Sequence, residues 1–316
     1  AIIEYNVVSH NEISSIYNHV VAAGIRCVGV LSPRHIQVKN NIISNNMAHS
    51  GSATVYGGAG GMQAYNCWGN ISHNTVQYNE ISGDIGSIAG GLHFANCAAG
   101  MILENNMITH NSANLYDLGG IGGGIAAWTS NIQLINNVIA HNYAENGCGI
   151  QIHLNYDGPA QFINNTIIDN EGDGLGGALY LWEADAVIMN SILWENGNSS
   201  DEIYLVDANV EVAYSNVAGG WPGTNNINAD PKFDDDSCHL NCADPSPCID
   251  AGIKNFDFGS VICTAPDYDF EGNDRPLDVT YDIGADEEVI CTWISQDMDE
   301  EFCSLEVTPN PSSGAL

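Results

Sequence analysis

Two acidic runs in the C-terminal part of the chain could bind a metal ion. They consist of Asp234, Asp235 and Asp236, and of Asp267, Asp269, Glu271 and Asp274. Ca²⁺ is bound by several carboxylate oxygens that a loop presents together. The runs therefore predict calcium binding, and a solvated acidic turn that binds nothing is the alternative. No organic cofactor is expected.

Glu183 and Asp185 are candidate catalytic residues, because two positions apart in a strand they would share one face. Two carboxyl groups about 5–9 Å apart can perform acid–base glycoside chemistry. The chain has 39 acidic residues against 6 basic ones, however, so neighbouring carboxylates occur without any catalytic role. Enzyme activity is therefore the less favoured interpretation.

Aromatic residues recur after pairs of glycines, in phrases such as GGMQAYN (60–66) and GALYLWE (177–183). Apolar and other residues alternate in these phrases, which is typical of a strand. If the first apolar residue of each phrase points inward, one outer face carries Tyr65, Trp128, His153, Tyr180, Trp182 and Tyr204. Such a strip predicts contact with sugar rings or with a neighbouring subunit, and the sequence leaves both open.

An internal repeat must position these residues. The phrase N-x-[IV]-x-x-N occurs six times and is followed by the longer NSILWEN, with first asparagines at 6, 41, 74, 106, 137, 165 and 190. Successive spacings fall from 35 (41 − 6) to 25 (190 − 165), a period typical of a solenoid. Strands without helices in each repeat predict an all-β parallel β-helix of about seven coils over residues 1–217.

The asparagines are predicted to be structural. Equivalent positions of stacked coils lie ~4.8 Å apart, so inward amides can hydrogen-bond to those above and below. One expected ladder contains Asn6, Asn41, Asn74, Asn106, Asn137, Asn165 and Asn190. The other contains Asn11, Asn46, Asn79, Asn111, Asn142, Asn170 and Asn196.

The asparagine phrase after a glycine-led strand resembles the right-handed parallel β-helix repeats of the pectin-lyase-like superfamily, and this resemblance implies a right-handed parallel β-helix here. That superfamily includes polysaccharide lyases, glycoside hydrolases, adhesins and passive structural proteins. Its lyases use a Lys or Arg base, for which Arg34 is a candidate here, although no acidic ligand lies near it in the sequence. The resemblance implies the fold and leaves the function open.

Two further resemblances concern the C-terminal part. SPCIDAG, GNDRP and DIGADE, between residues 246 and 287, resemble a choice-of-anchor domain that closes many secreted bacterial β-helix proteins. LEVTPNPSSGAL (305–316) resembles the start of a type IX secretion sorting domain. They imply an extracellular or bacterial cell-surface protein with repeats over 1–217, an acidic Cys-rich cap over 218–290, and a linker with a truncated sorting domain over 291–316.

The ten cysteines are expected to form disulfides, six of them in or just beyond the cap. Cys238, His239, Cys242 and Cys248 could instead suggest zinc, but disulfides are favoured in an exported protein. Cys67 and Cys97 end equivalent strands of adjacent coils, which would place their Cα atoms ~5 Å apart. A disulfide between these two is therefore predicted.

The net charge of −33 disfavours nucleic acid as a partner, and no apolar run is long enough to span a membrane. The expected partners are other copies of the chain, surface proteins or glycans. The favoured function is that of a secreted structural or adhesive protein that self-assembles into filaments. The alternative is a polysaccharide-binding or polysaccharide-degrading protein that uses the aromatic face.

Overall fold

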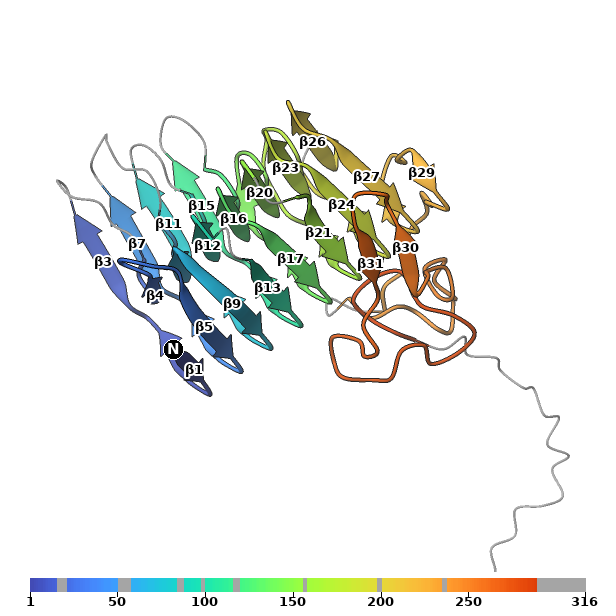
Figure 1. Cartoon of the computed structure of the whole chain (residues 1–316), viewed down its shortest axis with the longest axis horizontal. Helices are drawn as coiled ribbons and strands as arrows, with labels where there is room; N and C mark the ends of the chain where they lie inside the picture. The colour runs from blue at the N-terminus through green and yellow to red at the C-terminus, as the bar shows by residue number, and fades with distance from the viewer. Residues whose placement is uncertain are drawn as a thin grey trace, which may run out of the picture.

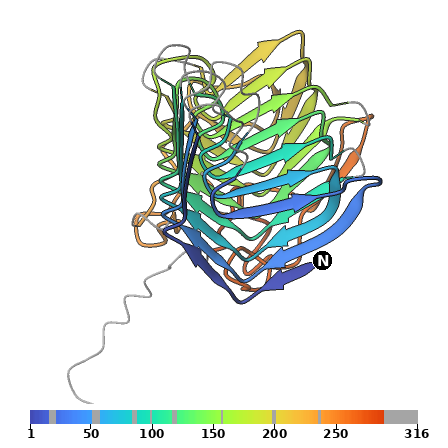
Figure 2. The ribbon, with the colours of Figure 1, turned by 90° about the vertical axis from the view of Figure 1, so that its left-hand side faces the viewer.

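The computed structural model describes residues 1–288, except 16–21, 51–57, 84–87, 98–99, 116–119, 156–157, 198–200 and 235–237. The described residues contain no helix, and their strands stack into four long parallel sheets. The chain winds through one strand of each sheet in turn, so the fold is a parallel β-helix (Figure 1). Figure 2 views the helix from its N-terminal side, with successive rungs one above another.

The first two sheets meet at the corner where the first asparagine ladder lies. The groove sheet contains β1 (Ile2–Glu4), β5 (Arg34–Lys39), β9 (Cys67–Ser72), β13 (Met101–Glu104), β17 (Ile132–Ile135), β21 (Ala160–Ile163), β24 (Ala186–Met189), β27 (Val210–Ala213) and β29 (Gly223–Thr224). The short-strand sheet contains β2 (Val7–Ser9), β6 (Ile42–Ser44), β10 (Thr75–Gln77), β14 (Met107–Thr109), β18 (Val138–Ala140), β22 (Thr166–Ile168), β25 (Ile192–Trp194) and β28 (Asn216–Val217).

The other two sheets complete each rung. The third sheet contains β3 (Glu12–Ser15), β7 (Met47–Ser50), β11 (Glu80–Gly83), β15 (Ser112–Leu115) and β19 (Tyr143–Ala144). The aromatic sheet contains β4 (Ile25–Val28), β8 (Met62–Tyr65), β12 (Leu92–Ala95), β16 (Ile125–Trp128), β20 (Ile150–His153), β23 (Leu179–Trp182) and β26 (Ile203–Val206). β30 (Asn255–Asp257) and β31 (Ile262–Thr264) form an antiparallel pair outside the helix.

The core consists of inward residues stacked in register. In the short-strand sheet, one such stack is Ile43, Val76, Ile108, Ile139, Ile167 and Leu193, all fully buried. The distance between rungs is constant, so each inward side chain packs on the equivalent side chain of the next rung. A strand of 3 residues is therefore long enough to place a residue in the core. The predicted fold class is confirmed.

Both asparagine ladders are confirmed, except that Asn190 does not belong to the first. Asn106 donates from Nδ2 to Asn137 Oδ1 at 2.9 Å and to the Ile71 carbonyl at 2.8 Å. Its Oδ1 accepts the backbone N–H and the side-chain N–H of Asn74, both at 3.0 Å. Every polar atom of this buried amide is therefore paired, which removes the cost of burying it.

The ends of the ladders differ from the prediction. Ser191 takes the place expected for Asn190, and its Oγ accepts the Asn165 N–H at 3.1 Å. Asn190 instead has the left-handed φ of 49° found in the residue before each ladder position. The second ladder continues past Asn196, which donates to the buried Glu202 carboxylate at 2.8 Å.

The paired glycines allow the aromatic sheet to approach the second ladder. A Cβ on Gly91 would lie 2.5 Å from the Gly124 carbonyl of the next rung and 3.2 Å from Asn111 Nδ2. Real Cβ atoms do not approach backbone that closely, so the repeated glycine is a packing requirement at this corner.

The C-terminal region lies along the flank of the helix (Figure 1). Leu240, Cys248 and Ile283 pack on outward residues of the short-strand sheet, such as Val138 and Ile192. Phe258, Cys263 and Tyr281 pack on outward residues of the groove sheet, which include Ile163 and Val187. Trp221 packs against the main core near the last rung. We call residues 218–288 the flanking cap.

The predicted disulfide between Cys67 and Cys97 is wrong for this structure. Both residues are buried thiols, and their sulfurs contact backbone carbonyls: Cys67 Sγ lies 3.3 Å from Tyr65 O, and Cys97 Sγ lies 3.5 Å from Ala64 O. Cys242 is disulfide-bonded, but Cys248 and Cys263 are buried thiols. Among the described residues, the flanking cap is therefore held mainly by packing and hydrogen bonds. Residues 291–316 lie outside the described part of the chain.

Candidate functional site

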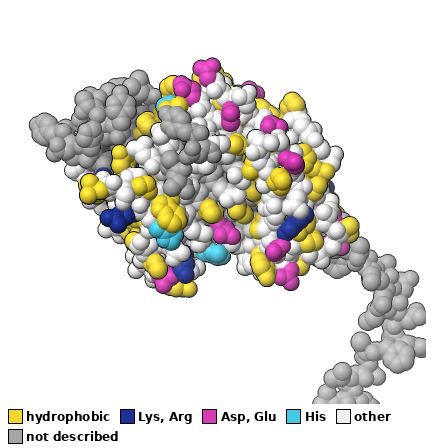
Figure 3. Space-filling model, viewed as in Figure 1, with side chains coloured by type: hydrophobic (Ala, Val, Ile, Leu, Met, Phe, Trp, Pro, Cys, Tyr) yellow, Lys and Arg dark blue, Asp and Glu magenta, His cyan; other side chains and the backbone are white. Residues whose placement is uncertain are grey.

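An open groove crosses the outer face of the groove sheet. Its volume is about 410 Å³, within the range of small-molecule and cofactor sites. The groove is lined by His35, Trp68, Gly69, Asn70, Gly100, Met101, Ile102, Asn131, Ile132, Gln133 and Gln161. Figure 3 views this side of the molecule, where hydrophobic and His side chains lie side by side, with Lys, Arg, Asp and Glu side chains scattered among them.

Trp68 forms one wall of the groove. Its side chain is 41% exposed, and its ring centroid lies 4.4 Å from that of His35 on the preceding rung. The register places Gly100 beside Trp68 on the following rung, and a Cβ on Gly100 would meet nothing within 4 Å. The groove is therefore open where this rung lacks a side chain, and the indole borders that space.

A row of amides runs along the floor. Strand pairing aligns Gln37, Asn70, Ile102, Gln133 and Gln161 across five successive strands. Gln133 Nε2 donates to Gln161 Oε1 at 3.1 Å, and Asn70 Nδ2 donates to Glu104 Oε2 at 3.4 Å. Asn70 Oδ1 is buried and has no hydrogen-bond partner. The floor thus offers neutral donors and acceptors at the strand spacing of ~4.8 Å.

The lining residues include no Asp, Glu, Lys or Arg. An aromatic wall beside neutral amides can stack on the apolar face of a ring and hydrogen-bond to hydroxyl groups at its edge. His35 is the one side chain of the described lining that could act as an acid or a base, and this lining has no pair of carboxyl groups for glycoside hydrolysis. The arrangement is suited to binding a neutral polyhydroxylated ligand.

The predicted aromatic strip is aligned on the aromatic sheet. Strand register places Tyr65, Trp128, His153 and Trp182 in one row and Tyr180 with Tyr204 in a second. These rings contact one another: His153 stacks on Trp182 at 4.5 Å, and Tyr180 stacks on Tyr204 at 5.7 Å. The prediction that this strip contacts glycans or subunits stays a prediction.

Some outward residues of the aromatic sheet are more buried than strand alternation predicted. Gln63, His93 and Gln151 point outward, yet each is at most 4% exposed. Burial lowers the pKa of His93 to about 4. Trp128 donates from Nε1 to Gln151 Oε1 at 2.8 Å, which fixes its ring. The aromatic sheet therefore offers less free ring surface than the sequence suggested.

The candidate catalytic residues are not brought together. Arg34 lies on β5, whereas Asp185 precedes β24, five strands farther along the same sheet, or ~24 Å at the usual strand spacing. Asp185 Oδ1 accepts the backbone N–H of Asn209 at 2.8 Å, and Glu183 occupies a left-handed turn position with φ of 49°. Both side chains are exposed at turns, and the Asp185 carboxylate has a local structural role.

The carboxylates predicted to bind calcium point to different partners. Asp267 pairs with Lys254, the buried Asp269 accepts backbone N–H groups of its own loop, and Glu271 pairs with His239. Asp274 and Asp234 are exposed, and Asp235 and Asp236 lie outside the described residues. The described carboxylates of these runs do not converge on one point, and calcium binding by them stays a prediction.

The comparisons with protein-family models, with curated proteins and with solved structures found no match. The likenesses to the pectin-lyase-like superfamily, the choice-of-anchor domain and the sorting domain therefore stay predictions. The described residues include no helix long and apolar enough to cross a membrane.

The groove residues were missed because strand alternation was applied only to the glycine-led phrases. A signal was present, since Asn70, Ile102, Gln133 and Gln161 each lie four residues before a first-ladder asparagine (for example 74 − 4 = 70). Trp68 and Gly100 lie six residues before theirs. The same alternation, counted back from each ladder, would have placed all six on one outer face.

Proposed function

We propose that this protein is an extracellular adhesive β-helix protein that binds a neutral glycan chain in the groove. The observation that carries the proposal is the exposed Trp68 ring beside the open space over Gly100, with a row of amides along the floor. A glycan chain could lie across several rungs, stack one ring on Trp68 and hydrogen-bond to Asn70, Gln133 and Gln161.

Binding is favoured over polysaccharide degradation. Uronate lyases need a base and a means of neutralising the uronate carboxylate, and glycosidases need two carboxyl groups at the scissile bond. The described lining of the groove supplies no carboxyl group and no Lys or Arg, and His35 is its one side chain that could act as a base. Extracellular location rests on the sequence resemblances alone.

A matched pair of tryptophan variants tests the proposal. Trp68 in the groove and Trp182 on the aromatic strip are 41% and 40% exposed, so Trp68→Ala and Trp182→Ala remove comparable surface from different faces. Neutral polysaccharides and a glycan array would be screened first, and hits measured by calorimetry. Trp68→Ala is expected to weaken binding at least about tenfold, or 1.4 kcal/mol, with Trp182→Ala unchanged.

Weaker binding by Trp182→Ala, with binding by Trp68→Ala unchanged, would place the site on the aromatic strip and refute glycan binding in the groove. Release of reducing or unsaturated sugars from a bound polysaccharide would show an enzyme and refute a purely adhesive role. The self-assembly expected from the sequence is a separate proposal, which electron microscopy of purified protein tests directly. A preparation of single particles at all protein concentrations would contradict it.

A further inference from the structure

Three potential metal ligands converge in the flanking cap. One ligand atom each from His239, Glu271 and Asp286 lies within 4.8 Å of the other two. His239 Nε2 is 3.3 Å from Glu271 Oε2. In a tetrahedral zinc site with bonds of about 2.0–2.1 Å, two ligand atoms are about 3.3–3.4 Å apart. The His–Glu pair already has this separation, and Asp286 needs only a small side-chain movement to join it.

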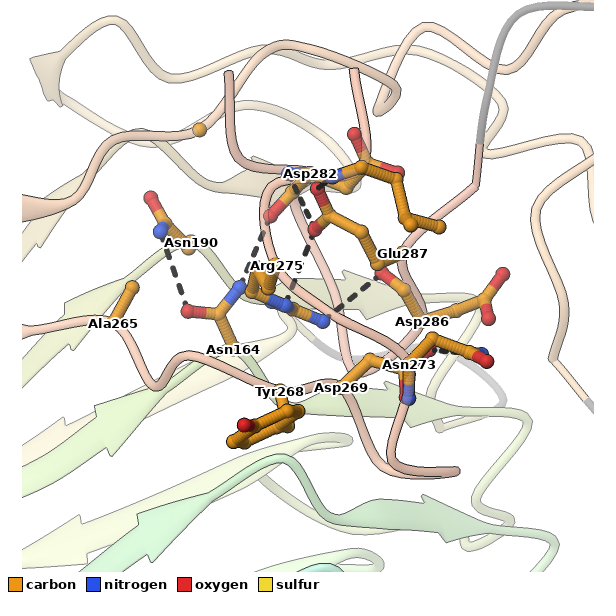
Figure 4. A network of polar contacts seen from close by, with 12 residues as sticks. Asn164, Asn190, Ala265, Tyr268, Asp269, Asn273, Arg275, Asp282, Asp286 and Glu287 are labelled. Atoms are coloured by element: carbon orange, nitrogen blue, oxygen red, sulfur yellow. Dashed lines mark hydrogen bonds and ion pairs between the residues drawn. The ribbon is translucent and has the colours of Figure 1, made fainter. Parts of the chain in front are cut away.

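Asp286 is the buried ligand, and its surroundings hold it in place. It is 4% exposed, and its Oδ2 accepts the N–H of Leu240, the residue after His239, at 2.7 Å. Arg275 donates to the Asp286 carbonyl at 3.1 Å, while its Nε lies 3.1 Å from Glu287 Oε2. In Figure 4 the Glu287 side chain points toward Arg275, whereas that of Asp286 points away from it.

Glu271 is presented by a rigid turn. Asp269 Oδ1 accepts the backbone N–H groups of Glu271, Gly272 and Asn273 at 2.9, 2.8 and 2.8 Å. The Phe270 N–H donates to the Ala285 carbonyl at 3.0 Å, which joins this turn to the segment that carries Asp286. The turn of Glu271 is thus joined to the segment of Asp286 by a backbone hydrogen bond, and the segment of His239 is joined to the Asp286 side chain through the Leu240 N–H. Such support fixes ligand positions before a metal binds.

We propose that His239, Glu271 and Asp286 bind one divalent transition-metal ion of the zinc class, with water completing the coordination. An imidazole nitrogen with two carboxylates suits Zn²⁺, whereas Ca²⁺ requires six to eight oxygen ligands. The His239 and Glu271 side chains are 31% and 48% exposed, so the metal can enter from solvent and retain a water ligand.

The bound ion would join the three cap segments at residues 239, 271 and 286. A metal that binds the folded cap and not the unfolded chain stabilises the fold in proportion to its affinity. This site lies in the cap and is independent of the proposed glycan groove, so either proposal can fail alone.

Zinc titration of the full chain tests the site. Protein treated with a chelator and dialysed would be titrated calorimetrically with ZnCl₂ and, separately, with CaCl₂, and its Tm followed. We expect saturable binding of one Zn²⁺ per chain with a rise in Tm, and no comparable effect of Ca²⁺. Titration with Co²⁺ should give the intense visible bands of a four- or five-coordinate site.

Variants distinguish zinc binding at this site from nonspecific zinc binding to surface histidines. Glu271→Gln changes an exposed side chain and should weaken zinc binding more than about tenfold, as should His239→Ala. His110→Ala is the matched control, because His110 and His141 lie 4.9 Å apart on the exposed corner of the helix. Absence of stoichiometric zinc binding, or loss of it in His110→Ala with Glu271→Gln unaffected, would overturn the proposal.

Discussion

Replacement of Asn106 by alanine tests whether the asparagine ladder stabilises the fold. The variant loses two bonds donated by the Asn106 amide and two accepted by its Oδ1. The buried backbone N–H of Asn74 then lacks its acceptor, whereas the Asn74 side chain keeps the Val38 and Ser72 carbonyls. A buried donor left unpaired costs about 1–3 kcal/mol, so the expected loss is about 1–3 kcal/mol.

Asn105 provides the control, because it is the same residue type at the adjacent position. It has a left-handed φ of 53° and makes one exposed contact, from Nδ2 to His73 Nε2 at 3.1 Å. Glycine tolerates this φ, so Asn105→Gly should cost less than about 1 kcal/mol. Urea unfolding followed by tryptophan fluorescence and by circular dichroism would measure both variants. Equal midpoints for Asn106→Ala and Asn105→Gly would refute the ladder as a source of stability.

Three further predictions concern other buried contacts. Burial raises the pKa of Glu202 to about 7. The folded protein therefore holds a proton that the unfolded chain loses above about pH 4.3, so the free energy of unfolding of the wild type should fall as pH rises from about 4.3 to about 7. Urea titrations across this range should show a flatter slope for Glu202→Gln. Arg275→Met leaves the buried Glu287 carboxylate without its partner and should cost about 3–5 kcal/mol, with faster proteolysis of the flanking cap. Gly91→Ala places a Cβ 2.5 Å from the Gly124 carbonyl and should cost about 1–3 kcal/mol, read as a lower Tm; an unchanged Tm would contradict the packing at this corner.

The repeat could be predicted because its information is local. The spacing of asparagines and the alternation after glycines determine strand positions and ladder registers. The place of Ser191 in the first ladder was missed because the motif was written for asparagine, whereas NSILWEN is one residue longer than the other phrases and has serine at the ladder position. The residue before each ladder position adopts a left-handed turn, and counting that extra position would have corrected the register.

The sites could not be predicted in the same way because they depend on contacts between distant segments. The groove exists where Gly100 leaves space beside Trp68, which becomes apparent only when two rungs are aligned. The cap ligands His239, Glu271 and Asp286 share no motif and meet through the return of the chain along the flank of the helix. The Cys67–Cys97 disulfide failed for a related reason, since stacking brings residues close without fixing the direction of their sulfurs.

The most direct test of the glycan groove is fluorine NMR of protein labelled with 5-fluorotryptophan. The protein has six tryptophans, and the fluorine signal that is lost in a Trp68→Phe variant is that of Trp68. Titration with a neutral oligosaccharide that the protein binds should shift the Trp68 signal in proportion to saturation and leave that of Trp182 in place. A saturating ligand that shifts Trp182 and leaves Trp68 unchanged would contradict the proposed site.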